Sequence, residues 1–134
     1  MGLPGSGKTW LAQRLQNHMK CAWFNADEVR KMAHDWDFTI DGRLRQASRM
    51  KNLADFESKA CGRIVICDFV CPTDEARLSF GADFTVWMNT IQSGRFEDTN
   101  KMFERPTKVD LHIEHFITEA EVSNVVNVIA GVHA

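Results

Sequence analysis

The chain has 134 residues and a mass of 15.3 kDa, which is the size of one domain and leaves no room for a second. Hydrophobic residues make up 44% and charged residues 25% of the sequence, a composition typical of folded rather than disordered chains. The formal net charge of -2 excludes a global positive field for duplex DNA, and no apolar run approaches the roughly 20 residues of a membrane-spanning helix.

Hydrophobic periodicity predicts alternating helices and strands along the chain. In chain order the predicted elements are a helix (7–20), a strand (21–25), a helix (27–34), a helix (41–60), a strand (63–70), a helix (73–80), a strand (83–88), a strand (111–116) and a helix (119–129). Residues 35–40 are expected to form a loop. Residues 92–108 are polar and lack a firm period, so we interpret them as a mobile segment.

The strand around residues 63–70 is the clearest and sets the fold class. It contains the continuous apolar run Ile64–Cys67, which is typical of a parallel strand covered on both faces. Strands that alternate with helices indicate an α/β domain. We therefore predict a three-layer domain of the P-loop NTPase type, with a parallel sheet flanked by helices.

The strongest motif lies at the start of the chain, where Gly2-Leu3-Pro4-Gly5-Ser6-Gly7-Lys8-Thr9 matches GxxxxGK[ST] in full. Its glycines let successive backbone N–H groups turn inward toward phosphate oxygens, and the following helix adds its positive dipole end. Lys8 is expected to reach the β- and γ-phosphates of ATP, and the Thr9 hydroxyl to bind Mg²⁺.

This motif ordinarily follows a buried strand, whereas here only Met1 precedes it. Two interpretations remain open: the natural chain starts upstream of the given sequence, or the sheet has a gap at its centre. We favour the first. In either case the first strand of the sheet is missing from this chain.

Two carboxylates follow predicted strands, at the edge where phosphate chemistry is expected. Asp27 lies at a helix start, so it can accept a proton from an attacking hydroxyl, help to hold Mg²⁺, or simply cap the helix. Asp68 follows four apolar strand residues, which is the form of a Walker B metal ligand.

Several segments together resemble the adenylylsulfate kinase family. Phe24-Asn25-Ala26-Asp27-Glu28-Val29-Arg30 is similar to a family segment that reads close to DGDNVR, and Asp37-Phe38-Thr39 follows it as in the family. The similarity continues in an RxxNxxR-like helix (Arg43, Gln46, Arg49), in Ile66–Pro72, which resembles a strand ending in a FISP-like turn, and in Trp87–Thr90, which resembles a VDTP segment. The compact form is similar to versions carried by bacteriophages.

The resemblance implies roles for residues on the side of the phosphate acceptor. Arg30 and Arg43 match family positions that bind the anionic acceptor, Phe38 is a candidate for stacking on its base, and Gln46 replaces a family Asn. An exposed helix face remains the alternative for each arginine, and equally so for Arg45 and Arg49.

Residues 95–108 fall where related kinases carry a lid, in which Arg95 or Arg105 would neutralise charge on the transferring phosphoryl group. A solvated loop remains the alternative for each of the two arginines. His112 and His115 are three apart but lack a third ligand, so a metal site is not expected there. The four cysteines are interpreted as buried free thiols: Cys21, Cys61, Cys67 and Cys71.

The sequence is therefore interpreted as an ATP- and Mg²⁺-dependent kinase for the 3′-hydroxyl of adenylyl sulfate, with Lys8 and Asp27 catalytic and with Thr9, Asp27 and Asp68 at the metal. The alternatives are a kinase for another hydroxyl acceptor and a nucleotide-binding remnant without turnover.

Departures from the family pattern gather on the acceptor side: Asn25, Ala26, Glu28 and Ser48. We expect small-molecule partners rather than membrane or long nucleic acid, keep a homodimer open, and expect a cytoplasmic location (that of the host if a phage encodes the chain).

Overall fold

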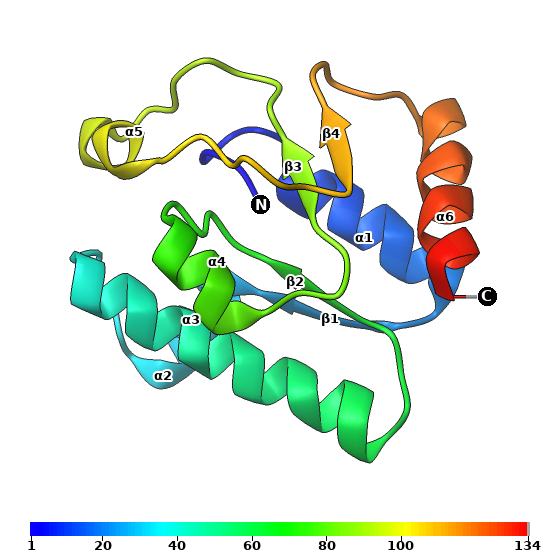
Figure 1. Cartoon of the computed structure of the whole chain (residues 1–134), viewed down its shortest axis with the longest axis horizontal. Coiled ribbons are helices and arrows are strands. Elements are labelled where there is room, and N and C mark those ends of the chain that lie inside the picture. Colours follow the sequence, from blue (N-terminus) through cyan, green and yellow to red (C-terminus); the bar gives the residue numbers. More distant parts are fainter. Residues whose placement is uncertain (134) are drawn as a thin grey trace.

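The computed structural model describes residues 1–133, and Figure 1 shows their arrangement. In chain order the elements are α1 (Lys8–Met19), β1 (Ala22–Asn25), α2 (Ala26–Ala33), α3 (Ile40–Asp55), the π-helical turn η1 (Phe56–Ala60), β2 (Val65–Asp68), α4 (Asp74–Phe80), β3 (Val86–Met88), α5 (Glu97–Met102), β4 (Leu111–Ile113) and α6 (Glu119–His133). The predicted strands are all present, each shorter than its apolar run because ladder pairing sets its ends.

The strands form two parallel pairs. β1 pairs with β2 in the register Ala22↔Val65 to Asn25↔Asp68, and β3 pairs with β4 in the register Val86↔Leu111 to Met88↔Ile113. No strand among residues 1–133 lies between β2 and β3, so the sheet consists of two halves. The described residues thus contain no strand that joins the two half-sheets.

Helices cover both faces of the half-sheets, as Figure 1 shows. α1 packs against α6 on one face, and α3 packs against α4 on the other. This arrangement confirms the predicted α/β class with parallel strands between two helical layers.

The apolar core divides in the same way. The larger cluster joins α1, β3, β4 and α6 through six buried side chains: Leu11, Leu15, Met88, Ile113, Val125 and Ile129. A smaller one joins α3 to α4 and the turn before it through Ala47, Cys71 and Ala76. Fully burying a Leu or Ile side chain stabilises a fold by about 1.5–3 kcal/mol, so the first cluster anchors the helix that carries the phosphate-loop motif.

Residues 92–108 are more regular than predicted, because they contain α5. Asn100 bonds Gly94 twice, accepting from its N–H at 2.8 Å and donating to its carbonyl at 2.9 Å. The Glu104 N–H also donates to the Pro72 carbonyl at 2.7 Å. These contacts, rather than an apolar stripe, support the helix.

Two further predictions are corrected. The cap of α2 is Asn25 and not Asp27: the Asn25 side chain accepts a hydrogen bond from the Glu28 N–H at 3.1 Å, which leaves Asp27 in the first helical turn. Of the four cysteines, which are all free, Cys61 is exposed in the turn after η1 rather than buried.

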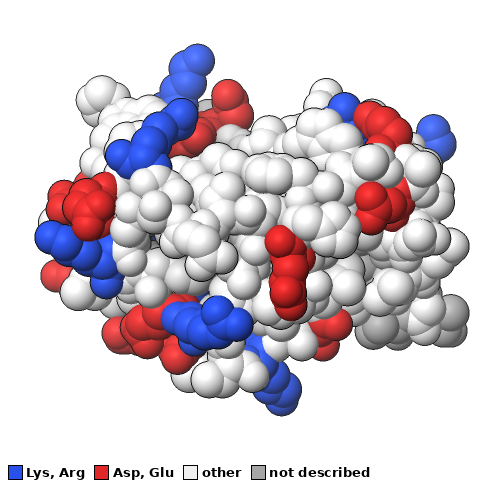
Figure 2. Space-filling view, turned by 90° about the horizontal axis from the view of Figure 1, so that it is seen from above, with Lys and Arg blue, Asp and Glu red and all other residues white. Residues whose placement is uncertain are grey.

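On the face shown in Figure 2, basic and acidic side chains are interspersed and form no single-sign stripe. None of the helices described is long and apolar enough to cross a bilayer.

Candidate active site

The phosphate-loop motif occupies the turn before α1, at the carboxyl ends of the strands. Gly7 directly precedes the helix with φ of 96°, in the left-handed region that favours glycine. Gly2 fits a close approach of two backbones, because a Cβ built there lies 2.6 Å from the Met88 carbonyl oxygen. The Thr90 hydroxyl donates to the Ser6 carbonyl at 2.7 Å and fixes the far side of the loop. All eight motif residues therefore lie where a phosphate chain can meet the N-terminus of α1.

Lys8 is the half-buried cation of the site. Its Nζ donates to the Leu3 carbonyl at 3.0 Å, so the side chain folds back over the loop. Burial lowers the pKa of Lys8, and the charges of Asp68 and Asp27 partly offset that effect. Both carboxylates are thus close enough to act on this ammonium group.

Thr9, Asn25 and Asp68 form one hydrogen-bonded cluster at the ends of β1 and β2. The Thr9 hydroxyl donates to Asp68 Oδ2 at 2.9 Å. Asn25 Nδ2 donates to the same carboxylate oxygen at 2.9 Å and to Thr9 Oγ1 at 3.2 Å. The β1–β2 register explains this meeting, because Asn25 and Asp68 are partners in the ladder.

The donor set of this cluster fits Mg²⁺, which prefers hydroxyl, carboxylate and water oxygens and keeps several waters. Across residues 1–133 no group of three or more His, Cys, Asp or Glu side chains is placed to hold a metal. Thr9 and Asp68 would therefore hold the ion only together with phosphate oxygens, as in nucleotide sites. His112 meets Asn89 at 3.0 Å, and His115 lies on the surface beside Glu121.

Asp27 lies within electrostatic range of both Lys8 and Arg30. Its side chain is exposed on the first turn of α2. Its charge raises the pKa of Lys8 on one side and that of Arg30 on the other, although burial makes the net shift downward in both. A carboxylate within range of a phosphate loop and of a second cationic site is suitably placed to accept a proton from an incoming hydroxyl.

Arg30, Phe38 and Arg43 come together beside α5. The Arg30 guanidinium lies 4.4 Å and that of Arg43 5.3 Å from the centroid of the Phe38 ring. Arg30 is buried and donates to the carbonyls of Asp35 and Asp37 at 2.9 and 3.1 Å. Burial, together with the charge of Arg30, lowers the pKa of Arg43. In the described part of the chain neither guanidinium forms a salt bridge, so the pair keeps its positive charge for an anion.

Arg45 and Arg49 differ from this pair, because both bind carboxylates. Arg45 forms two hydrogen bonds with Asp35, at 2.7 and 3.0 Å, and Arg49 donates to the same side chain at 2.9 Å. Gln46 is buried and donates to the Ala26 carbonyl at 3.0 Å, while its oxygen accepts from Arg49 at 2.6 Å. Gln46 therefore joins α3 to the start of α2, with both ends of its amide engaged.

The expected lid segment, residues 95–108, lies against the arginine pair. Thr99 on α5 is buried, and its hydroxyl accepts a hydrogen bond from Arg43 at 2.8 Å. Arg95 is exposed over Phe96, and Arg105 lies 4.9 Å from the Trp87 ring centroid. Neither arginine is held by a carboxylate among the described residues.

Three residues of this site were not predicted from the sequence: Asn25, which donates to Asp68, Thr90 behind the loop, and Thr99 in contact with Arg43. Asn25 carried a usable signal, because a capping amide at the end of a parallel strand lies beside the carboxylate that ends the next one. Thr90 and Thr99 carried none, since their partners are 84 and 56 residues away in sequence.

Parallel strands between helical layers, with a phosphate loop opening α1, define the fold of the P-loop NTPases, and solved kinases share this fold. A family model described as adenylylsulphate kinase matches residues 1–92, and the chain belongs to that family. A probable adenylyl-sulfate kinase of Aeropyrum pernix is 36% identical over 85 residues, which are 57% of this chain. That match spans 44% of the relative's own length, less than half.

Solved structures agree on the fold. The APS kinase of Mycobacterium tuberculosis in complex with AMPPNP and APS gives a TM-score of 0.79 at 19% identity, covering 97% of this chain and 94% of that one. Shikimate kinase from Aquifex aeolicus gives 0.66 at 18% identity, covering 98% and 94%. At these identities the similarity concerns the fold alone.

Proposed function

We propose that this chain transfers the γ-phosphoryl group of ATP to the 3′-hydroxyl of adenylyl sulfate, giving 3′-phosphoadenylyl sulfate. The observation that carries the proposal is that Asp27 lies within electrostatic range of two cationic sites, the phosphate loop with Lys8 and the Arg30–Arg43 pair around Phe38. Membership of the adenylylsulphate kinase family supports this choice of acceptor.

On the nucleotide side, the loop amides and Lys8 would hold the phosphates of ATP in line with the acceptor. Mg²⁺, held by Thr9 and Asp68 together with the phosphates, would neutralise charge that develops on the transferring group. The Lys8 ammonium, which now donates to the Leu3 carbonyl at 3.0 Å, would follow that charge from the γ-phosphate to the product.

On the acceptor side, an anionic nucleotide with a planar base suits the Arg30–Phe38–Arg43 arrangement. Guanidinium groups bind sulfate or phosphate oxygens with two parallel hydrogen bonds, and the Phe38 ring is 47% exposed and so free to stack on a base. Asp27 would then accept the proton of the attacking hydroxyl. The segment 95–108 would exclude water, with Arg95 or Arg105 adding charge neutralisation.

The test is a phosphoryl-transfer assay with γ-labelled ATP and a panel of acceptors: adenylyl sulfate, AMP, free nucleosides, a 5′-hydroxyl oligonucleotide and shikimate. We expect label on adenylyl sulfate alone and loss of transfer in Lys8→Ala. Preferred labelling of another acceptor refutes the substrate assignment and retains the kinase. Mg²⁺-dependent ATP binding without transfer to any acceptor refutes the kinase and favours a nucleotide-binding remnant.

A further inference from the structure

The guanidinium group of Arg43 on α3 is anchored along one edge. Its Nε donates to the Phe38 carbonyl at 3.0 Å, and its Nη2 donates to the Thr99 hydroxyl at 2.8 Å. The side chain makes no other hydrogen bond with residues 1–133. Since Nε and Nη2 lie along one edge of the planar fork, the edge formed by Nη1 and the second Nη2 proton keeps its donors for two parallel hydrogen bonds with an anion.

Both anchors of Arg43 are neutral groups, a carbonyl and a hydroxyl. They fix the direction of the guanidinium group but leave its positive charge uncompensated. Arg45 and Arg49 differ, because the Asp35 carboxylate compensates their charges. A hydroxyl at residue 99 therefore suits an arginine that must keep one orientation and still attract an anion.

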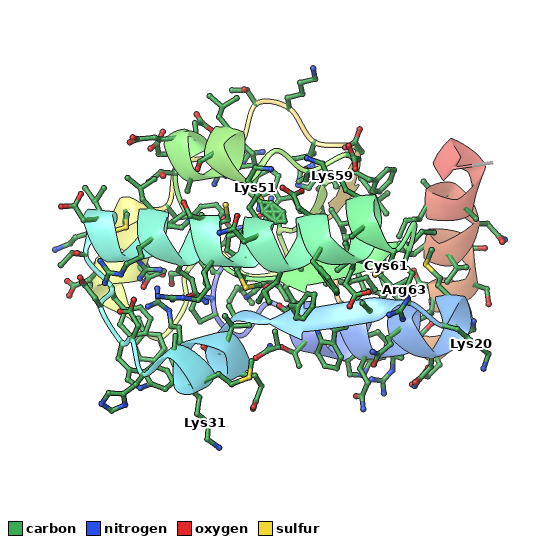
Figure 3. All side chains as sticks on the ribbon, turned by 90° about the horizontal axis from the view of Figure 1, so that it is seen from below. Lys20, Lys31, Lys51, Lys59, Cys61 and Arg63 are labelled. Carbon is green, nitrogen blue, oxygen red and sulfur yellow. The ribbon has the colours of Figure 1, made fainter. Side chains whose placement is uncertain are left out.

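Thr99 reaches Arg43 from α5, 56 residues further along the chain. Figure 3 shows α5, in yellow, at the end of the molecule where α3 begins, whereas Lys20 and Arg63 lie toward the opposite end. Thr99 is 4% exposed, so the hydrogen bond is shielded from water and is correspondingly stronger. The acceptor-side arginine thus depends on a buried group of a distant segment.

The helix α5 is braced against the phosphate loop. Asn100, the residue after Thr99, accepts a hydrogen bond from the Gly94 N–H and donates one to the Gly94 carbonyl. Gly94 lies against the loop, because a Cβ built there would be 3.1 Å from the Pro4 carbonyl oxygen. Two successive residues of α5 therefore connect Arg43, through Gly94, to the loop that would bind ATP.

The other end of the same segment is fastened to α4 and to the turn before it. The Arg77 Nη2 donates to the Glu104 carbonyl at 2.7 Å, and the Glu104 N–H donates to the Pro72 carbonyl at 2.7 Å. With contacts at both of its ends, α5 presents the Thr99 hydroxyl to Arg43 from a fixed position.

We propose that Thr99 is a positioning residue of the acceptor site, whose hydroxyl holds the Arg43 guanidinium group so that its free edge meets the anionic group of the acceptor. The inference rests on the proposed kinase function and adds to it a contribution of α5 to acceptor binding. Thr99 acts through Arg43 and does not touch the reacting atoms. Its loss should therefore weaken acceptor binding and leave the chemical step largely intact.

Substitutions of Thr99 separate this role from a purely structural one. Thr99→Val removes the hydroxyl at nearly constant size, Thr99→Ser retains it, and Thr99→Asp retains a hydrogen-bond acceptor but compensates the charge of Arg43. Val and Asp should each raise the acceptor KM by about fivefold or more, with kcat and the ATP KM within about twofold, and Ser should leave all three within about twofold.

Thermal denaturation checks that each variant is folded. If the bond served only to hold α5 in place, Thr99→Asp would behave like the native chain, because a carboxylate binds Arg43 at least as firmly as a hydroxyl does. A native acceptor KM in Thr99→Asp would therefore overturn the proposal, as would a native acceptor KM in Thr99→Val.

A double variant tests whether Thr99 acts through Arg43. Arg43→Lys alone should raise the acceptor KM about tenfold, and adding Thr99→Val should raise it by less than about twofold more. Multiplicative effects of the two substitutions would refute the proposed role of Thr99.

Failure of the proposed function is distinguishable from failure of this inference. If adenylyl sulfate is not phosphorylated, the same variants are compared on the acceptor that the panel identifies. Calorimetry with inorganic sulfate, while Mg²⁺ and AMPPNP fill the phosphate loop, gives a readout without turnover: Thr99→Val should bind sulfate about threefold or more weakly than the native chain and Thr99→Ser should not. Equal sulfate affinity of the native chain and Thr99→Val would overturn the inference whatever the acceptor is.

Discussion

Replacing Asn25 with Asp tests the charge arrangement at the metal side of the site. In the native cluster the Asn25 amide donates to Asp68 Oδ2 at 2.9 Å, and its oxygen caps α2 by accepting from Glu28. Asn25→Asp keeps the cap, because a carboxylate also accepts that bond, but it sets two carboxylate oxygens against each other. The variant therefore isolates electrostatics from helix capping.

The expected penalty follows from the distance. Two unit charges 2.9 Å apart at an effective dielectric constant of 20 repel by about 6 kcal/mol. Taking up one proton limits the cost, because holding a carboxyl group with an ordinary pKa of about 4 in its neutral form at pH 7 costs about 4 kcal/mol. We therefore expect N25D to lose about 4 kcal/mol of unfolding free energy at pH 7.

The pH dependence has a definite sign. A shared proton raises the folded-state pKa of the carboxyl pair, so the variant is least destabilised below pH 4, where the proton is present in both states. Its deficit grows as the pH rises from about 4 toward the raised folded-state pKa. Urea denaturation of N25D and the native chain at pH 4.5, 7 and 8.5 measures this difference.

The swapped double variant provides the matched control. N25D/D68N restores one amide and one carboxylate across the same ladder pair, so its stability should return to within about 1 kcal/mol of the native chain. A loss below about 1 kcal/mol in N25D at pH 8.5, or a double variant as unstable as N25D, would refute the role of Asn25 as the neutral donor to Asp68.

Two further outcomes are expected. Asp27→Asn should lower kcat by 10²- to 10⁴-fold while the Kd for ATP stays within about twofold. Steady-state kinetics and calorimetry measure the two quantities, and an unchanged kcat would contradict the role of Asp27 as base. Arg43→Lys should raise the acceptor KM about tenfold through loss of planar two-bond contacts, whereas Arg45→Lys, at a residue already paired with Asp35, should change it less than twofold. Equal effects of the two lysine variants would exclude Arg43 from the acceptor site.

Elements with a strong local pattern could be predicted from the sequence. The helix after Lys8 and the strand at Ile64–Cys67 follow from apolar spacing, and the phosphate loop follows from a full motif. The helix α5 could not be predicted, because its six residues carry no apolar stripe and depend on contacts such as Asn100 with Gly94.

Site residues, too, could be predicted where the local sequence pattern is strong. Lys8, Thr9 and Asp68 were identified from residues that each strand or loop displays by itself, and they do meet in space. The division of the arginines required the fold: Arg45 and Arg49 reach Asp35 across a loop of unpredictable path, while Arg30 and Arg43 meet around Phe38. Asn25 and Asp27 are two residues apart, and both are good capping residues. Only the backbone geometry shows that Asn25 is the one that caps α2.

The division of the sheet has a mechanical consequence. The phosphate loop is fastened to one half through the Ser6–Thr90 bond and to the other through the Thr9–Asp68 bond. The loop therefore connects the two half-sheets. Any movement that separates them also displaces the backbone that would bind the triphosphate. Nucleotide affinity should thus decrease when the packing between the two half-sheets is weakened.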